Sequence, residues 1–113
     1  MTSIRNSLRL LFDQNVPAPL ARSILGHEVA RAAQMGWGEL ANGELLAAAE
    51  RAGFDVLVTV DQNLRHQQNL ANRGIGLVVL SSNRWPLIRD CLPHVVTEIA
   101  RGGNRAGGTG AIP

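Results

Sequence analysis

Apolar and polar positions alternate along the chain in blocks that predict strands followed by helices. The clearest block is Phe54–Leu64, a nearly unbroken apolar run that stops at an acid and two amides. Its apolar residues point to both faces, which is typical of a strand in a parallel sheet covered by helices on each side. Strands are also predicted at 8–12 and 77–80, with a weaker one within 27–33.

Helical spacing of apolar residues follows these strand blocks. A Pro near the start and a Gly at the end frame the first helix, from Pro17 to Gly26. In the last helix Pro93 predicts a kink, or a break into two short helices, near Asp90 to Leu92. The expected helices cover about 17–25, 42–52, 65–73 (a short polar surface helix) and 87–99.

The alternation of strands and helices predicts one α/β domain. The fold class is a three-layer α/β/α arrangement around a mainly parallel four-stranded sheet with right-handed crossovers. A chain of 113 residues has the size of one domain. The domain is expected over residues 1–101. Residues 102–113 are Gly-rich with little apolar surface and are expected to form a disordered tail.

Composition narrows the compartment and the partners. No apolar run approaches the roughly 20 residues of a membrane span, and residues 1–7 lack the apolar segment of a secretory signal. We therefore expect a cytoplasmic protein without a membrane part. Cys91 is the single cysteine, which excludes a disulfide framework and a CxxC zinc site.

The pI near 10.0 overstates how basic the chain is, because its net charge is only +2. The chain has no Lys or Tyr, so few groups change charge between neutral pH and the pH at which Arg loses its proton, and a small excess of Arg is enough to give a high pI. Bulk charge therefore gives no argument for a polyanion partner.

Acidic residues follow two of the predicted strands. In a parallel sheet, each helix begins at the edge where the preceding strand ends, so Asp13, Asp61 and the first-turn helix residue Glu44 are expected at one edge. Three carboxylates there would repel one another unless a cation lay among them, and hard oxygen ligands suit Mg²⁺ or Mn²⁺. Comparable edge positions are held by Asn15, Asn42, Asn63 and Ser81.

Several of these residues also have a structural explanation. Asn15, Asn42 and Asn63 each precede a predicted helix, so N-capping alone can explain them. Glu44 is favourable at a helix N-terminus whatever its function. Asp13 and Asp61 favour a site, because each ends an apolar strand and has an Asn two positions later.

Three further residues are candidates for RNA contact. Trp37, between two glycines, can stack on a base or cover the core as an amphipathic lid. Arg65 and His66 belong to a polar run that can face a phosphate backbone or simply solvent.

Taken together, the chain resembles the PIN-like domain family, the small α/β fold of VapC-type toxin ribonucleases, and especially a short branch of it. The resemblance covers about Leu8 to Ile99. It is carried by Leu-Leu-Phe-Asp-Gln-Asn-Val-Pro at 10–17, Gly-His-Glu-Val at 26–29, Gly-Trp at 36–37, Asn-Gly-Glu-Leu-Leu at 42–46 and Asp-Gln-Asn-Leu at 61–64.

The resemblance implies a Mg²⁺- or Mn²⁺-dependent endoribonuclease of toxin–antitoxin type, with Asp13, Glu44 and Asp61 as metal ligands and catalytic residues. Asn15, Asn42 and Asn63 would surround them. Typical members carry further acids at the positions of Asn63 and often Asn42, and an amide contributes no charge to hold a cation.

The alternative is therefore a PIN-like module that binds RNA or a protein partner with little or no catalysis. The implied partners are RNA, a small antitoxin protein and, in a homodimer, a second copy of the chain. A flavodoxin-like receiver domain also gathers acids at strand ends, but this chain lacks the Lys that receivers use.

Overall fold

The computed structural model describes residues 7–62, 74–102, 111 and 112. Its elements are, in chain order, β1 (Arg9–Phe12), α1 (Ala18–Ser23), β2 (Glu28–Arg31), the 3₁₀ helix η2 (Ala32–Met35), α2 (Asn42–Arg51), β3 (Val56–Thr59), β4 (Gly76–Leu80), α4 (Trp85–Asp90), α5 (Leu92–Ala100) and β5 (Ala111–Ile112). The polar helix expected at 65–73 lies outside the described residues.

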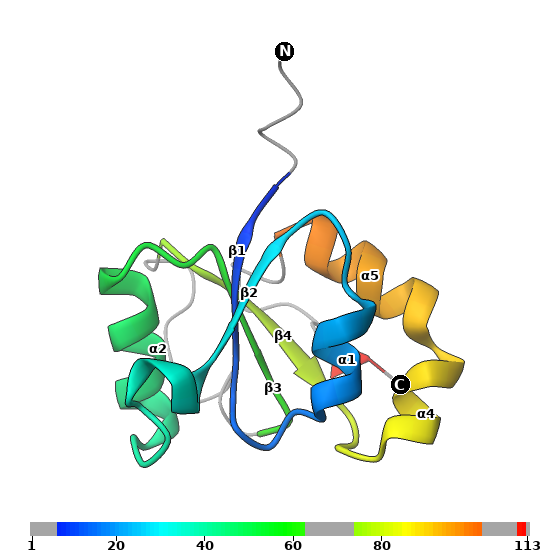
Figure 1. Cartoon of the computed structure of the whole chain (residues 1–113), viewed down its shortest axis with the longest axis horizontal. Coiled ribbons are helices and arrows are strands. Elements are labelled where there is room, and N and C mark those ends of the chain that lie inside the picture. Colours follow the sequence, from blue (N-terminus) through cyan, green and yellow to red (C-terminus); the bar gives the residue numbers. More distant parts are fainter. Residues whose placement is uncertain (1–6, 63–73, 103–110, 113) are drawn as a thin grey trace.

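The sheet has the strand order β2-β1-β3-β4-β5, and every pair is parallel. The predicted three-layer fold with a parallel four-stranded sheet is confirmed (Figure 1). A two-residue strand, β5, extends it, because Ala111 pairs with Val79 and Ile112 with Leu80. The prediction of a disordered tail over 102–113 did not anticipate this strand, and residues 103–110 and 113 are not among those described.

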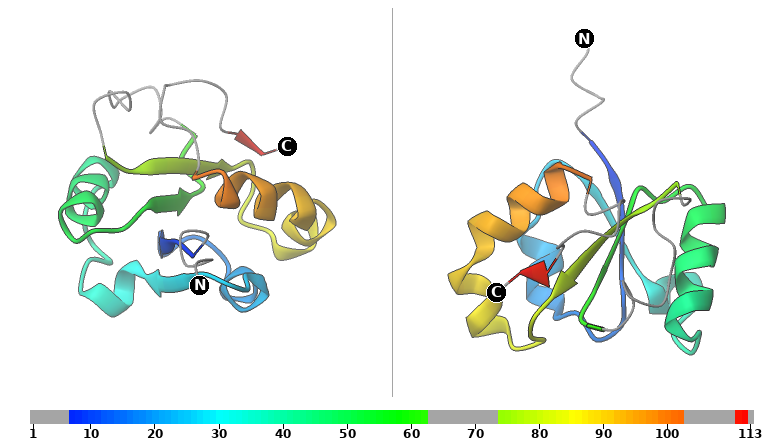
Figure 2. Two further views of the ribbon diagram at one scale, coloured as in Figure 1. Left: turned by 90° about the horizontal axis from the view of Figure 1, so that it is seen from above. Right: turned by 180° about the vertical axis from the view of Figure 1, so that it is seen from behind.

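Helices cover both faces of the sheet. Helices α1, α4 and α5 lie on one face and α2 on the other (Figures 1 and 2). Because side chains alternate along a strand, neighbouring residues of β1 and β3 enter different cores. The first core includes Leu10, Phe12, Leu20, Val58, Ile88, Val95 and Ile99. The second includes Leu11, Leu45, Leu46, Ala49, Phe54 and Leu57.

The last helical segment is interrupted where the sequence predicts a break. Helix α4 ends at Asp90 and α5 begins at Leu92, with Cys91 between them at φ −115° and ψ 24°. Pro93 has no N–H to donate to the carbonyl four residues earlier, and its ring would clash there in a continuous helix. Placing Pro93 in the first turn of a new helix removes both problems.

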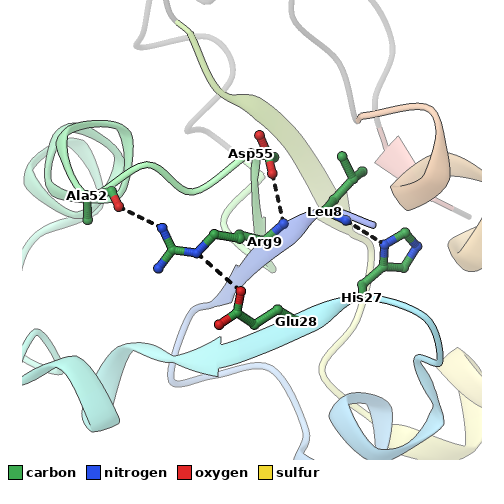
Figure 3. Close-up of polar contacts among 6 residues, drawn as sticks. All are labelled: Leu8, Arg9, His27, Glu28, Ala52 and Asp55. Atoms are coloured by element: carbon green, nitrogen blue, oxygen red, sulfur yellow. Dashed lines mark hydrogen bonds and ion pairs between the residues drawn. The ribbon is translucent and has the colours of Figure 1, made fainter. Parts of the chain in front are cut away.

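Arg9, at the amino end of β1, contacts residues at the amino ends of the neighbouring strands β2 and β3 (Figure 3). Its Nη1 donates a hydrogen bond to the Ala52 carbonyl at 2.9 Å, its Nε lies 3.4 Å from Glu28 Oε1, and its guanidinium carbon lies 4.5 Å from the Phe54 ring centroid. The Arg9 backbone N–H donates to Asp55 Oδ2 at 2.8 Å. These polar groups therefore have structural contacts with one another at the amino edge of the sheet.

Among the described residues, the helices are all too short or too polar to cross a membrane.

Candidate functional site

The strand order places a topological switch point between β1 and β3. From β1 the chain passes over one face, through α1, to β2, and it returns over the other face, through α2, to β3. In open α/β sheets, ligands bind outside the carboxyl ends of the strands at such a point. The residues that follow β1 and β3 are therefore the first candidates for a site.

Asp13, directly after β1, holds a buried carboxylate at this position. The residue is only 6% exposed, and its backbone N–H donates to the Val58 carbonyl at 2.9 Å. The Thr59 hydroxyl donates to Asp13 Oδ2 at 2.8 Å, and Thr59 is fully buried. Because both ends of this hydrogen bond are fixed by the central strands, the orientation of the carboxylate is fixed as well.

Asp61 reaches the same hydroxyl through its backbone. Its N–H donates to Thr59 Oγ1 at 3.2 Å, and the residue is half-buried. The Thr59 oxygen thus accepts from Asp61 while its proton goes to Asp13. The structure therefore brings Asp13 and Asp61 together at one edge, as the sequence predicts.

Thr59 is one residue of this edge that sequence reasoning missed. A Thr inside an apolar strand is an ordinary strand former, so its residue type gives no warning. The available signal was its place at the end of a run buried on both faces, where a hydroxyl needs a partner.

Asn15 lies exposed in the turn between β1 and α1. The N-cap position of α1 is Pro17, and no side chain caps this helix, so the capping explanation of Asn15 was wrong. Its neighbour Gln14 approaches the loop before α2, because a Cβ added to Gly38 would lie 2.9 Å from Gln14 Oε1. The turn after β1 and the loop after η2 therefore meet at this edge.

Glu44 has a structural contact at the start of α2. Its Oε1 accepts a hydrogen bond from the Ala41 backbone N–H at 3.0 Å, the carboxylate half of a capping box. Ala41 is the N-cap and Asn42 the first helical residue, so the prediction of an Asn42 cap was wrong by one position. Among the described residues, no three Asp, Glu, His or Cys side chains form a group that could hold a metal ion.

This geometry predicts different effects for two changes at Glu44. Glu44→Ala should lower the free energy of unfolding by about 0.5–1 kcal/mol, because Ala41 loses its acceptor. Glu44→Gln keeps an oxygen acceptor and should cost only a few tenths of that. Urea unfolding of both variants measures the difference. Equal losses for the two would show that the charge, not the hydrogen bond, is what Glu44 contributes.

Trp37 packs on the core beside α2. Its ring lies edge-on to Phe54 with a centroid distance of 6.3 Å, and the residue is half-buried. The explanation of Trp37 as a lid over the core is therefore confirmed. Only the exposed part of its ring is left for stacking on a base. Asn63, Arg65 and His66 lie outside the described residues.

A guanidinium belongs to the same edge. Arg31, the last residue of β2, donates from Nη2 to the Val16 carbonyl at 3.1 Å, and Val16 N–H donates to the Asp13 carbonyl at 3.0 Å. Arg31 Nη1 is buried without a hydrogen-bond partner in the described part of the chain. Burying an unpaired donor is costly. The contact with Val16 places the positive charge of Arg31 beside the loop that carries Asp13.

The fold and these contacts define an open α/β domain with an acidic position at its switch point. Comparisons with family models, with curated proteins and with solved structures found no match to this chain.

Proposed function

We propose that this chain is a PIN-like, metal-dependent endoribonuclease of toxin–antitoxin type that hydrolyses RNA phosphodiester bonds at the carboxyl ends of β1 and β3. The observation that carries the proposal is the Asp13 carboxylate, buried at the switch point and hydrogen-bonded to Thr59. Burying a carboxylate is unfavourable, and buried acids at a ligand-binding edge mark functional sites.

The donor set suits a hard divalent cation. Asp13 and Asp61 provide carboxylates, and Gln14 and Asn15 in the turn after β1 provide amide oxygens. Mg²⁺ in phosphate-processing sites commonly uses one or two carboxylates together with water and substrate phosphates. The set therefore fits one Mg²⁺ or Mn²⁺ shared with the RNA better than a complete protein cage. When bound, such an ion supplies positive charge that stabilises the phosphate in the transition state.

The chain's own residues supply orientation. The hydrogen bond from Thr59 orients the Asp13 carboxylate, which limits reorganisation when the site is filled. Asp61 would orient the attacking water, and Arg31 adds positive charge near the loop that faces the RNA. A cytoplasmic location, a small antitoxin partner and a homodimer are part of this proposal.

The test combines RNA cleavage with metal binding. Purified protein with Mn²⁺ is expected to cleave a single-stranded RNA, and Asp13→Asn and Asp61→Asn should each lower the cleavage rate by at least about 100-fold, the scale of losing one positioned electrostatic group. Glu28→Gln, at the opposite edge of the sheet, is the matched control and should retain the rate. Absence of cleavage by the wild-type protein with either Mg²⁺ or Mn²⁺ would overturn the proposal.

A second candidate is a PIN-like binding module without catalysis. It is favoured by Glu44, one of the three expected metal ligands, because its carboxylate already accepts a hydrogen bond from Ala41 at the start of α2. Calorimetric titration with Mn²⁺ separates the two functions. Binding that Asp61→Asn abolishes supports the enzyme, whereas RNA binding without any Mn²⁺ binding at millimolar concentration supports the module.

A further inference from the structure

A cavity of about 300 Å³ opens where β4 meets α4. Its size is at the lower end of the range for small-molecule sites, about 300–1,000 Å³, so it suits one nucleoside better than a longer segment. Leu80, Leu87 and Ile88 line it with apolar surface, and Ser81, Ser82 and Asp90 add polar groups. Leu87 is 51% exposed, so its side chain offers open apolar surface to a flat ring.

The polar groups of this cavity favour a base over a phosphate. The exposed Asp90 carboxylate accepts hydrogen bonds and repels anions. A carboxylate has two oxygens side by side, and two parallel hydrogen bonds to a charged group are stronger and more specific than one. Among the RNA bases, guanine alone presents two adjacent donors, N1–H and the 2-amino group, on its Watson–Crick edge. Unpaired RNA bases are commonly recognised on that edge.

The cavity lies next to the proposed cleavage position. Gln62, adjacent to Asp61, donates from Nε2 to the carbonyl of Leu80 at 2.6 Å, and Leu80 lines the cavity. Thr59 pairs with Val79, so Asp61 and Ser81 each stand two residues beyond the same register pair. Neighbouring strands lie about 4.8 Å apart. A chain with its phosphate at Asp13 and Asp61 can therefore place a neighbouring base over β4.

We propose that this cavity binds a guanine base of single-stranded RNA beside the cleaved bond, with Asp90 accepting hydrogen bonds from the guanine N1–H and 2-amino groups. The apolar side chains contact the face of the base, and the serine hydroxyls lie near its edge. The inference rests on the proposed function and adds to it the base that sets the cleavage sequence.

Nucleoside binding tests the cavity without requiring catalysis. Titration of the full chain with guanosine, followed by amide chemical shifts, is expected to perturb Ser81, Ser82 and Cys91. Inosine, which lacks only the 2-amino group, should bind about tenfold more weakly, the effect of one hydrogen bond to a charged group. Asp90→Asn should remove the preference for guanosine over inosine, whereas Glu28→Gln, at the opposite edge, should keep it. Equal binding of guanosine, inosine, adenosine and uridine, or no shift at these amides, would overturn the base site.

Two further readouts separate this inference from the proposed function. Because Cys91 is the single cysteine and lines the cavity, guanosine should slow its reaction with a thiol reagent. Cleavage of an RNA with randomised positions should occur beside G, and Asp90→Asn should relax that preference. A protein that binds guanosine in the cavity but cleaves no RNA loses the proposed function and keeps the base site. A protein that cleaves RNA without base preference loses the base site and keeps the function.

Discussion

Leu57→Ala is expected to lower the free energy of unfolding by about 3–5 kcal/mol, which would leave a domain of this size marginally stable. Leu57 is fully buried in the middle of β3, in the core beside α2. It pairs in register with Leu11 and Leu77, both also buried. Removing its branched end leaves a cavity between two strands and a helix, where the parallel ladders prevent collapse.

Urea unfolding followed by circular dichroism measures this loss, and Leu25→Ala provides the control. Leu25 is 84% exposed, so truncating it should change the free energy of unfolding by less than about 0.5 kcal/mol. The unfolding slope should stay the same in both variants, because the fold is unchanged. Similar small losses at both positions would contradict the packing of β3 between two helical layers.

Much of this architecture follows from periodicity alone. The apolar run of β3 has both faces buried, as a run without alternation predicts. Pro93 divides the last helical segment because it lacks an N–H donor and its ring clashes in a continuous helix, and both properties can be read from the sequence. By contrast, β5 has too few residues for a pattern, and only its pairing with β4 defines it. The start of α2 was misplaced for a local reason, because the Glu44 side chain accepts the hydrogen bond of Ala41, a residue whose own side chain gives no capping signal.

The site was predictable where topology alone determines position. Asp13 and Asp61 follow strands that a parallel α/β fold must end at one edge, so their proximity needs no side-chain information. Topology alone does not single out Thr59 or Arg31, because it does not determine which partner a hydroxyl or guanidinium at the end of a strand will find. Their burial and their partners depend on how the loops fold over the edge, and those contacts are visible only in three dimensions.

Thr59→Val is expected to lower the free energy of unfolding by about 1.5–3 kcal/mol while preserving the volume of the side chain. The change removes the hydroxyl that donates to the buried Asp13 carboxylate at 2.8 Å and accepts from Asp61 N–H. A hydrogen bond to a charged group contributes about that much, and its loss leaves the acceptor unsatisfied. Thr59→Ser keeps the hydroxyl and is the control. It loses a methyl group but should retain the contact with Asp13.

A double-mutant cycle with Asp13→Ala separates this hydrogen bond from general effects of the substitution. In the Asp13→Ala background, Thr59→Val should cost about 1–2 kcal/mol less than in the wild type, because the acceptor is already gone. If Asp13 acts in cleavage, Thr59→Val should also slow cleavage by about 10–100-fold through loss of carboxylate orientation, and Thr59→Ser should restore most of the rate. Additive stability losses would show that the two side chains are not coupled. A coupled pair with unchanged cleavage would assign Thr59 to stability alone. Because Thr59→Val is read for both stability and cleavage, the cycle together with the cleavage rates decides whether the buried acid at the switch point is held for folding or for chemistry.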